Sequence, residues 1–334
     1  MKAEKLTTTE FDLIKKYFKP LSSRGAPAFS LSNDGAVFSP APGEDLVFTK
    51  DTLVAGGHFF SDDSPELIAQ KAQRVNLSDL AAMGAKPEGY LLSLALPKSG
   101  LNIDEWVSEF AGGLLKGQND FSWQIWGGDT VSTTGPITIS VTAIGSVKRG
   151  EFLSRSGAKP GDQIYVSGEV GDAACGLKVL EMGIDQENYT YLIDRYHLPV
   201  PRIELGKSLV GIATSAMDIS DGLMTDIGHI CEESKVGAVI NYYQIPTSTA
   251  LINFMKGNHL ETNEDYSHLI WNGGDDYELL FTISKEKEDV VKKISKELGV
   301  GLTKVGEITA DCKTILVGND DHKINIKGHG FSHF

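Results

Sequence analysis

The sequence predicts a mixed α/β protein of two domains, and three observations lead to this prediction. The chain has 334 residues, which is enough for two domains of ordinary size. In both halves, short apolar runs of strand length alternate with amphipathic helical segments. Gly, Pro and charged residues collect between positions 146 and 161, where we expect the boundary. The expected domains are residues 1–150 and residues 151–334.

The first half contains the longest helical pattern. This helix is expected to begin after Ser64, a good N-cap residue, with Pro65 in its first position, and to end at Gly84. The other elements expected in this half are helices at 9–18 and 103–115 and strands at 33–38, 46–54, 90–96, 123–126 and 137–144.

The second half repeats the alternation of strands and helices. Its expected elements are strands at 163–166 and 278–283, helices at 173–182 and 285–298, and strands around Val305 and Leu316. A Gly-rich turn at 168–176 joins the first strand to its helix, and either helix packing or phosphate binding would explain it.

The composition limits the classes of partner. There are 31 Lys+Arg against 45 Asp+Glu, and this net charge of -14 argues against nucleic-acid binding. No apolar run approaches the roughly 20 residues of a membrane span, and the first residues do not resemble a signal peptide, so we expect a cytoplasmic protein. Cys175, Cys231 and Cys312 lie far apart, and we interpret them as small buried residues.

Asp79 is the central candidate for metal binding. It is expected late in the long helix between Leu77 and Leu80, so its ionised carboxylate needs a partner, unless it lies on a solvated face or caps a turn. Five further aspartates stand where apolar runs meet Gly, Ser or Thr, which is where strand ends and loops deliver functional groups: Asp34, Asp51, Asp129, Asp218 and Asp221. We hypothesise that the six form one carboxylate cluster.

Such a cluster points to phosphate chemistry that is assisted by magnesium. Mg²⁺ takes oxygen ligands from carboxylates and substrate phosphates, and it would offset the repulsion between an acidic protein and a phosphorylated ligand. A Walker A loop and a G-x-G-x-x-G motif are both absent. A nucleotide would therefore be bound by another design, and metal-assisted phosphoryl transfer is the expected reaction class.

Six segments resemble, in order, those of thiamine-monophosphate kinases, and the resemblance runs from about residue 10 to the C-terminus. They are Asp51–Phe59, Val75–Ala85, Gly127–Thr130, Arg155–Asp162, Asp218–Leu223 and Gly273–Leu279. Related families, such as aminoimidazole ribonucleotide synthetase and selenophosphate synthetase, share the architecture but not this combination. The resemblance implies the two-domain fold of that superfamily and the conversion of ATP and thiamine phosphate to ADP and thiamine diphosphate. It also implies a homodimer that joins the sheets of the N-terminal domains, which bind ATP and metal, while the C-terminal domains close the site.

The resemblance also implies the site residues. Several Mg²⁺ ions would be held by Asp34, Thr49, Asp51, Asp79, Asp129, Asp218 and Asp221 and by the main chain of Lys50. The positions that would contact ATP are Gly128, Asp129, Arg155 and Ser220, and those near thiamine phosphate are His58 and Asp275. The candidate catalytic residues are Asp79, Asp129 and Asp218. Two alternatives stay open, a solvated Arg155 and a packed His58.

Three positions depart from the family pattern. Asn33 stands where a second carboxylate is usual, Lys50 interrupts a Ser-Thr-Asp site, and Asp275 replaces a Glu. These changes leave the number of metal ions open and keep two other functions in view: a related ATP-dependent enzyme with another acceptor, and a nucleotide-binding homologue without catalysis. Phe331 is one candidate for the aromatic residue that packs against the thiamine ring.

Overall fold

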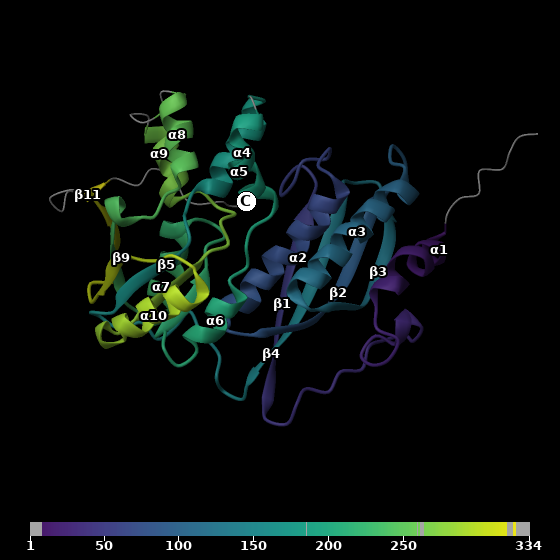
Figure 1. Ribbon diagram of the computed structural model, residues 1–334, viewed down its shortest axis with the longest axis horizontal. Helices are drawn as coiled ribbons and strands as arrows, with labels where there is room; N and C mark the ends of the chain where they lie inside the picture. The colour runs from purple at the N-terminus through teal and green to yellow at the C-terminus, as the bar shows by residue number, and fades with distance from the viewer. Residues whose placement is uncertain (1–8, 185, 259, 261–263, 319–322, 325–334) are drawn as a thin grey trace, which may run out of the picture. The chain divides into compact units, whose positions relative to one another are not determined.

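The computed structural model describes residues 9–184, 186–258, 260, 264–318 and 323–324, and it confirms the predicted two-domain α/β architecture (Figure 1). One compact unit comprises residues 1–80 and 87–146, and the other comprises residues 81–86 and 147–334. The described residues form one four-stranded and one seven-stranded sheet. The role expected for each domain stays a prediction.

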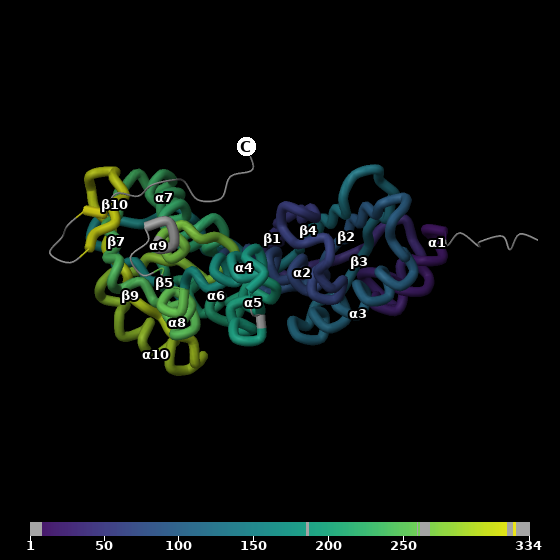
Figure 2. Tube along the Cα trace, turned by 90° about the horizontal axis from the view of Figure 1, so that it is seen from above, coloured from purple at the N-terminus to yellow at the C-terminus, as the bar shows by residue number. Residues whose placement is uncertain are grey.

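The first unit is a four-stranded sheet with two long helices on one face (Figures 1 and 2). The strand order is β1-β4-β2-β3, and β2 and β3 are parallel. Its elements are α1 (Glu10–Leu13), a π-helix (Ile14–Phe18), β1 (Glu44–Val54), α2 (Pro65–Ala82), β2 (Lys86–Pro97), α3 (Ile103–Phe121), β3 (Gln124–Thr133) and β4 (Thr138–Lys148).

Helices α2 and α3 approach closely because α3 carries glycine where they meet. A Cβ atom at Gly113 would lie 2.3 Å from the carbonyl oxygen of Glu66. The side chain of Gln73 joins the two helices by donating to the carbonyls of Gly113 and Leu114, at 3.4 and 3.3 Å. This packing fixes α2, and with it Asp79, over the sheet.

The opposite face of this sheet keeps apolar side chains in solvent. Phe48, Leu91 and Val131 come from three different strands and are 64%, 40% and 50% exposed. At one end of the sheet, Phe38 packs against Trp126 of β3, with ring centroids 4.7 Å apart. The N-terminal segment therefore covers a part of the sheet.

The second unit is a sheet with helices on both faces. The strand order is β11-β10-β7-β9-β5-β8-β6, and the β10–β7 pair is parallel. Its strands are β5 (Gln163–Ser167), β6 (Ser215–Asp218), β7 (Gly237–Asn241), β8 (Leu279–Ile283), β9 (Leu302–Thr309), β10 (Thr314–Val317) and β11 (Lys323–Ile324). Its helices are α4 (Asp172–Met182), α5 (Thr190–His197), α6 (Ile203–Leu209), α7 (Leu223–Ser234), α8 (Thr249–Gly257), α9 (Glu264–Trp271) and α10 (Glu288–Leu298).

Strand alternation divides the core of this unit into two layers. Ile164 and Val166 of β5 point to a cluster with residues of α4, α5, α7 and α8. Tyr165, which lies between them, points to a second cluster with residues of α6 and α10. Both faces of β5 are therefore buried, as its continuous apolar run requires.

Some details differ from the predictions. Residues 33–38 form no strand, because Asn33, Asp34 and Gly35 favour a bend and the segment packs as a loop. The helix expected at 9–18 divides into α1 and the π-helix, and α3 extends to Phe121. Cys175 and Cys231 are buried as predicted, but Cys312 is exposed. Phe331 lies outside the described residues.

Candidate active site

A carboxylate pair and a hydroxyl meet between β1 and α2 in the first unit. The Thr49 hydroxyl donates to Asp79 Oδ2 at 2.5 Å. Burial, followed by the negative charge of Asp79, raises the pKa of Asp51 from 3.8 to about 7. Two carboxylates that share a half-buried position are an environment that a cation stabilises. Asp79 thus accepts a hydrogen bond from a hydroxyl, and the metal ion suggested as its partner stays a prediction.

The register of β1 explains this arrangement. Thr49 and Asp51 are half-buried, while Lys50 between them is exposed. Since successive side chains of a strand point to opposite faces, the Lys50 side chain points away from the carboxylate pair. The main chain of Asp51 is fixed by its N–H, which donates to Asn76 Oδ1 at 3.1 Å.

A cavity of about 210 Å³ in the same unit brings together two segments that lie far apart in the sequence. Asn33 and Asp34 line it from the N-terminal loop, and Gly128 and Asp129 line it from β3. A Cβ atom at residue 128 would lie 1.9 Å from the carbonyl oxygen of Leu92. Close packing of β3 against β2 therefore requires glycine at this position.

His58 lies in the turn that follows β1. Its Nδ1 accepts the N–H of Val54 at 3.1 Å, so the proton of the neutral imidazole is on Nε2. The His58 N–H in turn donates to the Val54 carbonyl at 3.0 Å. The imidazole is half-buried. Local hydrogen bonds therefore hold this side chain in one orientation, whether or not it meets a substrate.

In the second unit, the loop between β6 and α7 carries three of the predicted residues. Asp218 ends β6 and is 3% exposed, and Ser220 and Asp221 follow in the loop. The Asp275 N–H donates to the Ser220 carbonyl at 2.9 Å, and the Tyr277 hydroxyl donates to Asp275 Oδ1 at 3.2 Å. The structure therefore brings Asp275 next to Ser220, although the two are far apart in the sequence.

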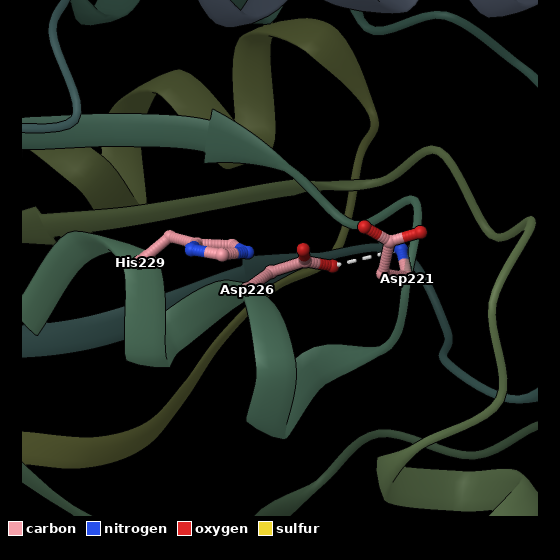
Figure 3. Close-up of side chains that lie close together, drawn as sticks. All are labelled: Asp221, Asp226 and His229. Carbon is pink, nitrogen blue, oxygen red and sulfur yellow. Dashed lines mark hydrogen bonds between the residues drawn. The ribbon is translucent and has the colours of Figure 1, made fainter. Parts of the chain in front are cut away.

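Asp226, in the first turn of α7, was not predicted. Burial, together with the neighbouring carboxylates of Asp218 and Asp221, raises its pKa well above the usual value. Asp221, Asp226 and His229 offer ligand atoms that all lie within 4.8 Å of one another (Figure 3). Over the described part of the chain, this is the one group of three metal-capable side chains so close together. None of the first-unit candidates belongs to it.

Glu278 is the second residue that the sequence reasoning missed. It is fully buried and accepts from Arg195 Nη2 at 2.9 Å and from Arg202 Nε and Nη2 at 2.6 Å each. The Ser167 hydroxyl donates to its second oxygen at 2.5 Å. Because both arginines come from other segments, no local pattern signals this network. It fixes the start of β8, three residues after Asp275.

Arg155 is exposed, and the segment that carries it follows the edge of β6. The carbonyl of Ser154 accepts the Ala216 N–H at 2.8 Å, and the Arg155 carbonyl accepts from the Ser234 hydroxyl at 3.3 Å. The segment of Arg155 therefore runs beside β6. The β6 residue that it contacts, Ala216, lies two residues before Asp218, the last residue of the strand.

Comparison with known proteins agrees with this architecture. The N-terminal domain model of AIR synthase related proteins matches residues 32–147, and the C-terminal domain model matches residues 159–319. These matches define the chain as a two-domain AIR synthase related protein. Among the curated relatives, the thiamine-monophosphate kinase of Escherichia coli K12 is 39% identical over 330 residues, which cover 97% of this chain and 98% of that protein. The chain belongs to the thiamine-monophosphate kinase family and is an enzyme.

Two solved structures are similar over most of their length. The thiamine-monophosphate kinase from Stenotrophomonas maltophilia K279a has a TM-score of 0.78 and 36% identity, covering 88% of this chain and 91% of that one. A structure described as AaThiL complexed with AMPPCP and TMP has a TM-score of 0.77 and 30% identity, covering 97% of both chains. Within the described residues, no helix is both long and apolar enough to cross a membrane.

Proposed function

We propose that this chain transfers the terminal phosphoryl group of ATP to the phosphate of thiamine monophosphate, which yields ADP and thiamine diphosphate. The observation that carries the proposal is the half-buried pair of Asp51 and Asp79 beside the Thr49 hydroxyl, in a chain whose relatives are named for this reaction. The solved relative complexed with AMPPCP and TMP supports the same pair of substrates.

The reaction does not require a strong general base. The attacking oxygen belongs to a phosphate group that is already ionised at neutral pH, so no side chain needs to remove a proton. The barrier instead comes from bringing two anions together in line. The main tasks of the chain are therefore to align the substrates and to neutralise their charge.

The donor set of the first unit fits Mg²⁺. Asp51 and Asp79 supply carboxylate oxygens, and Thr49 supplies a hydroxyl. Burial and the negative charge of Asp79 raise the pKa of Asp51, and a bound cation would favour its ionised form. We propose that these residues and the main chain of Lys50 hold magnesium. Asp34 and Asp129 are proposed as further magnesium ligands at the cavity beside β3, which lies at the opposite edge of the sheet from β1. When bound, the ion neutralises charge on the transferred phosphoryl group.

The second unit is also proposed to carry residues that bind nucleotide and metal. Asp218 and Asp221 offer carboxylates for a further ion, and Ser220 and Arg155 offer a hydroxyl and a guanidinium for the ATP phosphates. Gly128 lines the cavity beside β3, where its main chain is proposed to contact ATP.

We propose that His58 and Asp275 contact thiamine phosphate. The Nε2–H of His58 is a hydrogen-bond donor for the phosphate, because its Nδ1 already accepts from Val54. Asp275 carries an anion suited to the positively charged thiazolium ring of thiamine. Its φ of +67° is a backbone conformation that Asp adopts more readily than most residues, and such strained positions cluster at functional sites.

We further propose a homodimer that forms through the open face of the four-stranded sheet. The side chains of Phe48, Leu91 and Val131 on this face are apolar and exposed, as expected of a surface that a second copy covers. Sedimentation equilibrium of the purified chain gives the mass directly, and a monomer at micromolar concentration would contradict the proposal. The cytoplasmic location stays a prediction.

The proposed reaction is tested with a panel of acceptors. The chain is incubated with ATP and Mg²⁺ and with thiamine monophosphate, free thiamine or no acceptor, and Asp79→Asn is compared with Asp120→Asn. Asp120 is the control, because it is an exposed helix aspartate of the same unit, which pairs with the exposed Lys116 and with the mostly buried Arg74. We expect product only from thiamine monophosphate, with loss of turnover in Asp79→Asn and full turnover in the control. Product from another acceptor, or turnover that persists in Asp79→Asn, would contradict the proposal.

A further inference from the structure

One oxygen atom of Asp226 accepts three consecutive main-chain amides. The N–H groups of Ser220, Asp221 and Gly222 donate to Asp226 Oδ2 at 3.1, 3.2 and 3.1 Å. Figure 3 shows the contact with Asp221. A single acceptor therefore fixes the whole loop between Asp218, at the end of β6, and the start of α7.

This arrangement replaces the usual cap of a helix. The N-cap position of α7 is Gly222, which has no side chain with which to accept an amide. Its φ of +115° and the main chain of Asn272, only 2.7 Å from where a Cβ would stand, require glycine there. The cap must come from elsewhere, and Asp226 reaches back from the first turn of the helix to supply it.

The opposite side of the loop is held as firmly. The Tyr277 N–H donates to the Ile219 carbonyl at 2.8 Å, and the Asp275 N–H donates to the Ser220 carbonyl at 2.9 Å. The amides of the loop thus point to Asp226, while its carbonyls point to the segment before β8. The directions in which the Ser220 and Asp221 side chains leave the main chain are set by these two rows of hydrogen bonds.

The environment of the Asp226 side chain is also energetically unfavourable. It is fully buried, and its Oδ1 atom has no hydrogen-bond partner among the described residues. An unsatisfied buried carboxylate oxygen lowers stability. The buried carboxylate therefore lowers stability through Oδ1, while its Oδ2 atom fixes three main-chain amides of the loop.

We propose that Asp226 is a positioning residue for phosphoryl transfer, which holds the loop of Ser220, Asp221 and Gly222 in the conformation that binds nucleotide and metal. The proposal rests on the proposed function, in which Ser220 contacts ATP and Asp221 holds Mg²⁺. Asp226 acts through the main chain of this loop. The position of its Oδ2 atom, more than its charge, determines the loop conformation.

Two conservative variants distinguish the position of the acceptor oxygen of Asp226 from the charge of its side chain. Asp226→Asn keeps an acceptor oxygen at the same distance but loses the charge, whereas Asp226→Glu keeps the charge but moves the acceptor by one methylene. Asp162→Ala is the matched control, because Asp162 is also a buried carboxylate of this unit that caps a turn, by accepting the Lys159 N–H at 2.9 Å. For each variant, kcat and the KM for ATP are measured at saturating thiamine monophosphate, with the urea midpoint and the amide exchange rates of residues 220–222.

We expect Asp226→Asn to stay within about threefold of the parent in kcat/KM for ATP, with unchanged amide exchange. Asp226→Glu should lose about 10- to 100-fold in kcat/KM, since a displacement of about 1 Å at a site costs this much. Its loop amides should exchange faster. Asp162→Ala should lower the urea midpoint and leave kcat/KM unchanged.

The proposal would be overturned if Asp226→Asn lost activity and Asp226→Glu kept it. If Asp226→Asn loses as much activity as Asp221→Asn while the loop amides keep their exchange rates, Asp226 acts by charge, as a metal ligand with His229. Asp226→Asn alone decides this point if Asp226→Glu does not fold. If the parent forms no thiamine diphosphate, the proposed function fails instead, and binding of ATP with Mg²⁺ by calorimetry then replaces kcat/KM as the measure of Asp226.

Discussion

Replacing Asp51 by Asn should stabilise the metal-free protein at neutral pH and abolish its activity. The pKa of Asp51 in the folded chain is about 7, against an ordinary value of 3.8. Between these two values the folded state binds more protons than the unfolded state, so stability falls as the pH rises through this window. Each pKa unit corresponds to about 1.4 kcal/mol. The charge of Asp51 therefore lowers the free energy of unfolding by at most about 4 kcal/mol above pH 7. Because Asp51 is only half-buried, we expect roughly half of this limit.

The assay is urea denaturation in EDTA between pH 4.5 and pH 8, followed by tryptophan fluorescence. Trp106, Trp123 and Trp126 belong to the first unit, so the signal reports mainly on the unit that contains Asp51. The stability difference between Asp51→Asn and the parent should be small at pH 4.5 and grow toward pH 8. Asp129→Asn is the control, because Asp129 is exposed in the same sheet and its neutralisation should change little.

Magnesium provides the second half of this test. A ligand that binds only the folded state raises its stability, so millimolar Mg²⁺ should stabilise the parent and have a smaller effect on Asp51→Asn. A difference between variant and parent that does not change with pH would refute the electrostatic argument. Equal stabilisation of both proteins by Mg²⁺ would refute the assignment of Asp51 as a ligand.

Two further predictions concern the supports of the site. Glu278→Ala should lower the free energy of unfolding by about 3–5 kcal/mol, because the buried guanidinium of Arg195 and the half-buried guanidinium of Arg202 lose their acceptor. Urea titration measures this loss, and a change below 1 kcal/mol would show that the network contributes little to stability. Gly128→Ala should destabilise the first unit, since a Cβ there would stand 1.9 Å from the Leu92 carbonyl oxygen. Gly112→Ala, on α3 with no atom within 4 Å of its Cβ position, should be neutral or stabilising by up to about 1 kcal/mol, and equal effects of the two would count against the packing argument.

Local sequence patterns predicted helices well where capping residues mark the helix ends. Ser64 and Pro65 marked the start of α2, and the apolar neighbours of Asp79 predicted that its carboxylate has a partner. The identity of that partner depends on how β1 lies against α2. Thr49 stands thirty residues earlier, so its approach to Asp79 results from tertiary packing that no local pattern contains.

The same reason explains the residues that were missed. Asp226 lies in a helix start, where an acidic residue is common, and nothing in the sequence shows that its oxygen reaches back to three amides. Glu278 reads as the edge of an apolar strand, and its partners Arg195 and Arg202 come from distant segments. The strand expected at 33–38 was wrong because Asn33, Asp34 and Gly35 favour a bend, and the short apolar run that follows them does not show whether a neighbouring strand is available for pairing.

The most direct test of the central claim is to follow the labelled terminal phosphoryl group of ATP. The chain is incubated with ATP labelled in that group, Mg²⁺ and unlabelled thiamine monophosphate, and the products are separated and counted. We predict labelled thiamine diphosphate and unlabelled ADP in equal amounts, with neither formed in EDTA. Labelled inorganic phosphate without labelled thiamine diphosphate, or AMP as the nucleotide product, would contradict direct phosphoryl transfer to thiamine monophosphate.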